Sequence, residues 1–435
     1  EETMLGDPMA LSALVTLVVI ALWASARLPE YLVALLFFAA VMVLQLAPAA
    51  VTFSGFASSA FWLVLSGFVL GTAIRSTGLA DRLANRLLPH LAGSWPRLVG
   101  GVVAISYALA FVMPSNMGRI TLLMPIVMAL ADRAGLAEGS RGRIGLALAV
   151  GFGTFQLSAS ILPANVPNLV MSGAAESAYG SHFAYLSYLL LHAPVLGIAK
   201  GALLTLCICG LFRARPQPVA AEAAQTPLSA AEWRLIALLG ATVLLWMTDS
   251  WHGIAPAWIG LAAACLCLLP RIGFLNGEQF AAGVNVRTCI YVAGILGLTA
   301  LVSHSGLGDR LGGALLAMMP DLHGKPFTAF GSLVGITALL NFVVTANGVP
   351  ALFTPLAQAL SAGSGLPLLT VLMTQVIGYA TPLLPYQASP IVVAMGMGKV
   401  PAREGLKLCL LLAALSFALL VPLDYLWFRL LGWIP

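Results

Sequence analysis

Apolar segments of about 17 to 25 residues recur along most of this chain, and each can cross a hydrocarbon core of ~30 Å as a helix. Hydrophobic residues occupy 60% of the 435 positions and charged residues only 9%. Soluble domains carry roughly 25% charged residues and cannot bury so much apolar surface. We therefore expect an all-α polytopic membrane protein with about 10 spanning helices and no large aqueous domain.

Three sequence matches in the same order predict an internal duplication. Gly78, Leu79, Asp81, Arg82 and Leu83 recur as Gly306, Leu307, Asp309, Arg310 and Leu311. Residues 115–136 then align with 345–366, and 161–167 with 383–390. We expect a first repeat over 1–212 and a second over 233–435. The segment 213–232, rich in Pro, Ala and charge, should be a cytoplasmic surface linker.

Each repeat is predicted to follow one order of elements. Three spanning helices come first, at about 9–26, 30–48 and 58–76, and again at 233–249, 254–270 and 287–304. An amphipathic stretch follows, over 79–91 and 307–320. Next come a helical hairpin, over 96–133 and 326–362, an interrupted helix and a last span.

The two hairpins are predicted to be re-entrant. Polar clusters at 114–118 and 345–350 divide each hairpin into arms of about 15 residues, roughly 22 Å long and too short to cross comfortably. Most Lys and Arg residues lie on one side of this arrangement, which the positive-inside rule makes cytoplasmic; examples are Arg82, Arg133, Arg213 and Lys399. The first hairpin then opens inward and the second outward, so the repeats are inverted. Both termini should lie outside, in a bacterial inner membrane.

Four polar interruptions fall at the predicted membrane depth: the two hairpin tips, 162–168 and 381–390. Irregular backbone is tolerated there only beside protein or a water-filled cavity, and inverted repeats with broken helices bind solutes at such points. Free helix N-termini suit an anion, although the same residues could simply cap the broken helices. The predicted substrate-contacting residues are Ser115, Asn116, Met117, Gly118, Arg119, Asn165, Pro167, Asn168, Thr345, Ala346, Asn347, Gly348, Thr381, Gln387 and Ser389.

The motifs Ser115-Asn116-Met117, Asn165-Val-Pro-Asn168, Thr345-Ala346-Asn347 and Gln387-Ala-Ser-Pro390 carry a family resemblance. The chain resembles the divalent anion/sodium symporter family, whose members carry dicarboxylates, citrate and sulfate. The resemblance implies sodium sites near Ser115, Asn116, Thr345 and Asn347, an elevator-type movement and a homodimer. It implies no cofactor other than Na⁺.

Two departures from the family pattern affect the predicted sodium sites. Met117 replaces an oxygen ligand with a thioether, which is a poor partner for a hard cation. Ala346 removes a side-chain amide from the second tip, which Asn347 could supply from the next position. Arg119 lies deep in the first hairpin and could provide the positive charge instead, bind an anion directly or pair with backbone carbonyls. Lys200, near a helix end, is expected to snorkel.

The sequence is compatible with more than one mode of coupling between the solute and an ion gradient. Most acidic residues fall at predicted loops, among them Asp81, Asp132, Asp249 and Asp309, so no buried proton carrier is identified. The leading prediction is a secondary active transporter of a small anion, a di- or tricarboxylate or a sulfate-like anion, that is cation-coupled or exchanging. A sodium-independent anion exchanger or uniporter and a carrier of a bulkier organic solute are the alternatives. A channel and a membrane enzyme fit less well, because neither a charged filter ring nor a catalytic constellation is found. The net charge of +5 reflects topology and indicates no nucleic-acid partner, and no ATP-binding loop is present.

Overall fold

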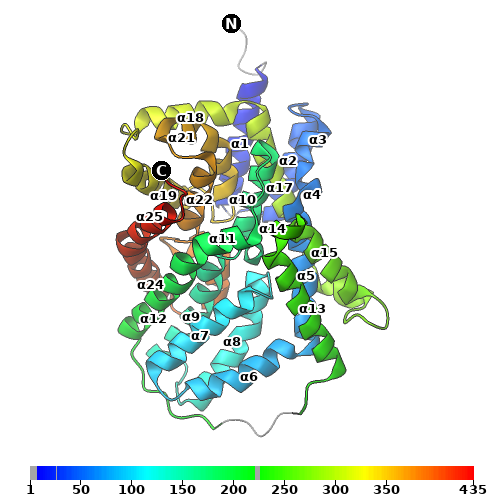
Figure 1. Ribbon diagram of the computed structural model, residues 1–435, viewed down its shortest axis with the longest axis vertical. Helices are drawn as coiled ribbons and strands as arrows, with labels where there is room; N and C mark the ends of the chain where they lie inside the picture. The colour runs from blue at the N-terminus through cyan, green and yellow to red at the C-terminus, as the bar shows by residue number, and fades with distance from the viewer. Residues whose placement is uncertain (1–6, 26, 221–225) are drawn as a thin grey trace.

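The computed structural model describes residues 7–25, 27–220 and 226–435, and within these ranges the regular structure is entirely helical (Figure 1). Five helical segments in the described residues are long and apolar enough to cross a membrane. They are Ser59–Thr77, Tyr185–Leu211, Ala230–Met247, Val286–His304 and Ala402–Leu430. Six apolar helices of 10–17 residues accompany them. The predicted all-α membrane architecture is confirmed.

The elements of the first half follow the predicted order closely. They are α1 (Pro8–Ser25), α2 (Glu30–Val43), α3 (Ala49–Thr52), α4 (Ser54–Ala57), α5 (Ser59–Thr77), α6 (Leu79–Leu91), α7 (Trp95–Ala110), α8 (Asn116–Arg133), α9 (Arg141–Ser158), η1 (Leu162–Ala164), α10 (Val166–Tyr179), α11 (Tyr185–His192), the π-helical η2 (Ala193–Ala199) and α12 (Lys200–Leu211). The helices α7 and α8 form the predicted hairpin, and η1 interrupts the next helix.

The second half repeats this order with a more irregular hairpin. It comprises α13 (Ala230–Met247), α14 (Asp249–His252), α15 (Pro256–Leu268), α16 (Gly277–Gly283), α17 (Val286–His304), α18 (Leu307–Met318), α19 (Pro326–Leu340), α20 (Val349–Phe353), η3 (Thr354–Leu356), α21 (Ala357–Ser364), α22 (Leu368–Tyr379), η4 (Pro385–Gln387), α23 (Ser389–Met397), α24 (Ala402–Leu415), the π-helical η5 (Ser416–Leu420) and α25 (Val421–Leu430). Pro350 and Pro355 divide the returning hairpin arm into α20, η3 and α21.

The same turn leads into both amphipathic helices. Gly78 and Gly306 each have φ +73°, a left-handed conformation that favours glycine and ends the preceding spanning helix. Figure 1 places α6 and α18, which follow these glycines, at opposite ends of the long axis of the molecule. Inverted repeats would produce this placement. The repeat boundaries and their orientation in a bilayer stay predictions.

Two separate hydrophobic cores divide the described residues. The first core, which we call the scaffold core, combines α1, α2 and α5 with α13, α15 and α17. The second, which we call the hairpin core, combines α7, α8, α9 and α12 with α19, α22 and α24. Each core thus draws equivalent elements from both halves of the sequence. The helices α6, α7, α8, α10, α11 and α20 have residues in both cores and join them.

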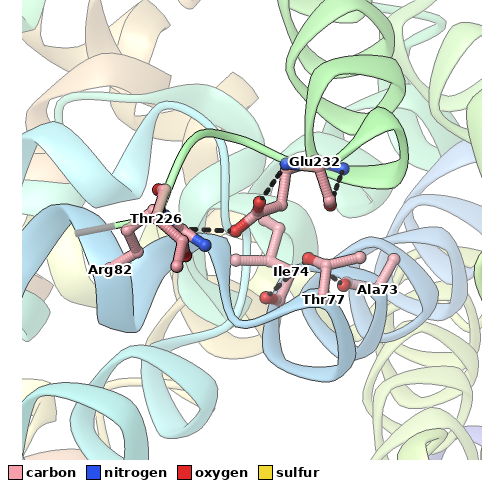
Figure 2. A network of polar contacts seen from close by, with 7 residues as sticks. Ala73, Ile74, Thr77, Arg82, Thr226 and Glu232 are labelled. Carbon is pink, nitrogen blue, oxygen red and sulfur yellow. Dashed lines mark hydrogen bonds and ion pairs between the residues drawn. The ribbon is translucent and has the colours of Figure 1, made fainter.

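The predicted linker is held against the protein rather than free. Its backbone is tied near the C-terminal end of α8, where Gln217 N donates to Ala134 O at 2.8 Å and Arg133 Nη2 donates to Ala220 O at 2.7 Å. Residues 221–225 lie outside the described residues. Beyond them, Figure 2 shows Arg82 of α6 donating to the carbonyl of Thr226 and pairing with Glu232 at 2.8 Å. The linker ends earlier than predicted, because a Ser229–Glu232 capping box begins α13 at Ala230.

Candidate functional site

A cavity of about 210 Å³ lies between the scaffold core and the hairpin core. The scaffold helices α2, α5 and α17 supply Glu30, Val64, Phe68, Thr288 and Tyr291, together with Asn285 directly before α17. The opposite wall contains both hairpin tips and the second broken helix, through Pro114, Ser115, Asn116, Met117, Asn347, Ser389 and Pro390. Val166 and Leu169 of α10 complete the lining. The structure therefore brings all four predicted interruptions to one cavity, the first broken helix through Val166.

Five of the predicted site residues line this cavity: Ser115, Asn116, Met117, Asn347 and Ser389. The others lie behind the lining and form its supporting contacts: Gly118, Arg119, Asn165, Pro167, Asn168, Thr345, Ala346, Gly348, Thr381 and Gln387. Sequence reasoning missed Glu30, Asn285, Thr288 and Tyr291, because they belong to unbroken scaffold helices or their caps. Asn285 caps α17 by accepting from Thr288 N at 3.2 Å, and an Asn-x-x-Thr start of a helix is a detectable signal.

The first hairpin tip presents the N-terminus of α8 to the cavity. Ser115 caps this helix, and its Oγ accepts from Gly118 N at 3.1 Å. Gly118 fits tightly, because a Cβ atom at this position would lie 3.0 Å from Met113 Cε. Met117 is 39% exposed and contributes its thioether to the cavity wall. An 18-residue helix that begins at a cavity wall gives that wall a positive potential.

Arg119 is fully buried and is surrounded by protein oxygen atoms. Its Nη1 donates to Met113 O, and its Nη2 donates to Ala164 O at 3.1 Å and Thr154 O at 3.4 Å. Nη2 also donates to Asn116 Oδ1 at 2.5 Å. Arg119 therefore joins the first tip to the first broken helix and lies behind Asn116.

Asn116 lies between Arg119 and the cavity. Its Oδ1 accepts from Arg119 and, at 3.2 Å, from Ser158 Oγ. These two donors fix the orientation of the amide, so its NH₂ group is the part available to the cavity. The first tip thus offers a neutral donor backed by a buried positive charge.

The first broken helix is held by its two asparagines. Asn165 caps α10 by accepting from Asn168 N at 3.1 Å, and Pro167 occupies the first turn. The Asn168 amide donates to Ala159 O at 3.1 Å and Ile161 O at 2.9 Å, which satisfies carbonyls freed by the break. Its Oδ1 accepts from Tyr379 Oη at 2.6 Å, so the break also contacts α22 of the second half.

The second tip and the second broken helix are joined through their backbones. Ala346 N donates to Gln387 O at 2.9 Å, and Gln387 Oε1 accepts from Leu383 N at 2.7 Å and Leu384 N at 3.2 Å. Thr345 O accepts from Gly348 N at 2.8 Å and closes the tip. These contacts place Asn347 and the exposed Ser389, at the start of α23, on the cavity wall.

Lys200 does not snorkel, contrary to the prediction. It is fully buried, and its Nζ donates to Ala380 O and Thr381 Oγ1, both at 2.8 Å. The carbonyl and hydroxyl at the break behind α22 bind the ammonium group and keep it inside the protein. The second broken helix, like the first, therefore contacts a buried basic side chain.

The expectation that acidic residues lie at solvated loops was incomplete. Asp249 is buried and accepts from Tyr185 N at 2.7 Å. Asp424 on α25, which sequence reasoning overlooked, is fully buried. An Asp within an apolar run such as 408–428 is itself a detectable signal of function.

The cavity has the chemistry of an anion site. The N-termini of α8 and α23 reach it, with Ser115 as the cap of α8 and Ser389 as the first residue of α23, and Arg119 adds a positive charge behind the wall. Glu30 is the one charged residue among the lining side chains, and it is exposed. Among the described residues, no group of three His, Cys, Asp or Glu could hold a metal ion.

Comparison with known proteins gives one family and one fold. Residues 6–434 match the family model of the sodium:sulfate symporter transmembrane region. A protein of Cupriavidus necator described as a membrane protein is 25% identical over 407 residues, which cover 88% of this chain and 77% of the relative. The L-tartrate/succinate antiporter of Escherichia coli K12 is 24% identical over 401 residues, with coverage of 86% and 79%.

Two solved structures share the fold at low sequence identity. The YdaH transporter of Alcanivorax borkumensis aligns with a TM-score of 0.56 and 15% identity, over 87% of this chain and 86% of that chain. MtrF of Neisseria gonorrhoeae, of a class of antimetabolite efflux pumps, aligns with a TM-score of 0.54 and 13% identity, over 86% of this chain and 82% of that chain.

Proposed function

Because this chain belongs to the family of the sodium:sulfate symporter transmembrane region and is an anion transporter of that family, we propose that it exchanges small dicarboxylates without sodium. The observation that carries the proposal is the oxygen cage around Arg119. Three backbone carbonyls and the Asn116 amide oxygen surround its guanidinium. Oxygen ligands of this kind are what a hard cation requires. Arg119 occupies such a cage permanently, so the chain carries the positive charge that a coupling ion would otherwise bring.

Two anion-binding ends facing one cavity favour a dicarboxylate. One carboxylate would bind at the α8 N-terminus, with Ser115 and the Asn116 NH₂ group. The other would bind at Ser389 and the α23 N-terminus, beside Asn347. The L-tartrate/succinate antiporter that this chain resembles supports both the four-carbon substrate and the exchange mode. A permanent charge also favours exchange, because the empty site would have to carry an unpaired positive charge through a low-dielectric layer.

We further propose that the hairpin core moves past the scaffold core as an elevator. The cavity lies between the two cores, so displacement of one core would carry half of the lining with it. The second tip and the second break lie beside the hairpin core and are linked by Gln387, and Arg119 links the first tip to the first break, which packs against both cores. The bound anion would therefore travel with its main ligands.

The test is uptake of labelled succinate into proteoliposomes, with or without an inward sodium gradient and with or without internal unlabelled succinate. We expect uptake that requires internal succinate and is the same in both sodium conditions. Stimulation by sodium in the wild type would contradict the proposal and favour cation-coupled symport. Failure to transport succinate under any condition would contradict the dicarboxylate assignment.

Arg119→Gln tests the residue that carries the proposal. Loss of the guanidinium leaves buried carbonyls without donors, so we expect exchange to fall by roughly tenfold or more, or to become sodium-dependent. Arg97→Gln, at an exposed position near the start of α7, is the matched control. Melting temperatures measured in the same detergent separate loss of transport from loss of folding. Wild-type, sodium-independent exchange by a folded Arg119→Gln protein would contradict the role of Arg119.

A further inference from the structure

A buried acid–base pair lies away from the cavity, where the last helices of the two halves meet. Asp424 of α25 is fully buried, and neither of its carboxyl oxygens has a hydrogen-bond partner among the residues that the structure describes. Lys200 of α12 is also fully buried and lies close enough to interact electrostatically with Asp424, although no salt bridge joins them. Two of the three Nζ donors of Lys200 bind Ala380 O and Thr381 Oγ1, which leaves one donor free.

Both members of the pair follow π-helical segments. Lys200 comes directly after η2, and Asp424 lies four positions beyond the end of η5. These two segments contact each other, and α25 contacts η2. Short π-helical segments inside longer helices occur frequently at functional sites.

The surroundings of Asp424 contain few other titratable groups. The elements packed most extensively against α25 are η5, α19 and η2, and none of them contains a titratable side chain. Helix α11 also reaches α25, where Trp427 Nε1 donates to Leu190 O at 3.1 Å, and it contains Tyr188 and His192. His192 precedes η2 and packs its ring against Phe428, with centroids 6.0 Å apart. Cys409 of α24, which lies near Lys200, donates to Pro382 O at 3.2 Å. Lys200 is therefore the one basic side chain, apart from His192, that faces Asp424 within the described part of the chain.

We propose that Asp424 is a proton-binding site that is protonated in this conformation. A carboxylate buried without a donor is far more costly than the neutral acid, because nothing replaces its hydration. When the hairpin core moves, the Asp424 O–H bond breaks and the proton passes to water, and the carboxylate then pairs with the free donor of Lys200. Intramembrane acids of this kind serve as proton carriers in transporters.

The proton site is connected to the cavity by a continuous set of contacts. Lys200 binds the carbonyl and hydroxyl at the start of the second break, and the same break continues through Gln387 to Ser389 on the cavity wall. Pairing of an ionised Asp424 with the third donor would draw the ammonium group away from Ala380 O and Thr381 Oγ1. Protonation and the geometry of the second break are thus linked, which would make anion exchange depend on pH.

The first test needs no substrate and does not depend on the proposed function. Infrared difference spectroscopy of the purified protein should show the carbonyl stretch of a buried protonated carboxylic acid at neutral pH. Asp424→Asn should remove this band, Asp424→Glu should shift it, and Asp249→Asn should leave it in place. A wild-type spectrum without the band, or a band that survives in Asp424→Asn, would overturn the proposal.

The second test asks whether the proton is used in transport and does rest on the proposed exchange. Proteoliposomes are loaded with unlabelled succinate, and exchange for external labelled succinate is followed between pH 5.5 and 8. We expect wild-type exchange to vary at least threefold over this range, whereas exchange by Asp424→Asn should vary much less. Equal pH dependence in both proteins, with Asp424→Asn folded, would overturn the coupling.

If Asp424→Asn fails to fold, the same comparison is made with Asp424→Glu. This variant should shift the midpoint of the pH dependence of exchange, and an unchanged midpoint would overturn the coupling. An infrared band without any succinate exchange would contradict the proposed function and leave the proton site standing.

Discussion

At the scale of single residues, Asn116 joins the buried charge to the cavity. Its oxygen accepts from Arg119 and Ser158, and its NH₂ group is left for the substrate. The family-like motif at 115–117 predicted that this residue would contact the site, and the structure places it on the cavity wall. The motif could not reveal that Arg119 would lie behind Asn116, because residues three positions apart in a helix can point either into a cavity or toward neighbouring carbonyls.

Asn116→Asp separates these two roles. The carboxylate keeps an acceptor for Arg119, so we expect the melting temperature to be maintained. It also replaces the donor at the cavity with a negative oxygen, so succinate affinity should fall by at least about tenfold, equal to about 1.4 kcal/mol. Isothermal titration calorimetry measures the affinity, with Asn276→Asp, at the exposed cap of α16, as the control. Unchanged affinity in Asn116→Asp would show that the first tip does not bind the anion.

At the scale of elements, the sequence predicted most helix boundaries to within a few residues. Gly78 and Gly306 end helices by their positive φ, and Ser58 and Ser229 begin them as caps, so these boundaries depend on local chemistry. The π-helical segments η2 and η5 were not predicted, since nothing in an apolar run specifies one extra residue per turn. The burial of Lys200 was missed for a related reason: its partners Ala380 and Thr381 are distant in sequence.

The close packing of α22 against the second hairpin depends on a glycine. A Cβ atom at Gly378 would lie 1.7 Å from Thr337 Oγ1 and 3.0 Å from Ala338 N of α19. Gly378→Ala should therefore destabilise the protein by about 1–3 kcal/mol and lower its melting temperature. Gly335→Ala, on α19 itself, meets no atom within 4 Å and should be neutral or slightly stabilising. Equal melting temperatures for the two variants would contradict this packing.

At the scale of the whole molecule, two hydrophobic cores with the cavity between them are the basis of the elevator proposal. The duplication predicted that equivalent elements would occur in both halves. It could not predict that the first three spans of both halves would join in one core and the hairpins of both halves in the other, because this depends on contacts between distant segments.

A disulfide across the boundary between the two cores tests their relative movement. A Cβ atom at Gly67 of α5 would lie 3.2 Å from Pro114 Cβ at the first tip, close to the spacing of a disulfide. In a protein without its native cysteines, oxidised Gly67→Cys/Pro114→Cys should bind succinate but lose exchange, and reduction should restore it. The pair Gly153→Cys/Ser106→Cys has the same 3.2 Å spacing but lies within the hairpin core, so its oxidation should leave exchange intact. Full exchange by the oxidised boundary pair would contradict the movement.

The ion pair between Arg82 and Glu232 connects the same two parts of the molecule at another point. Arg82 belongs to α6, which starts in the scaffold core at Leu79 and packs Ala84 and Leu88 in the hairpin core, whereas Glu232 lies in the first turn of α13 of the scaffold core. If Arg82 moves with the hairpin core, this pair separates and reforms in every transport cycle. The ion pair then stabilises the carrier conformation in which it is formed. It also raises the free-energy barrier for leaving that conformation. Its removal would therefore alter turnover and the asymmetry between influx and efflux more than it would alter the affinity for the anion.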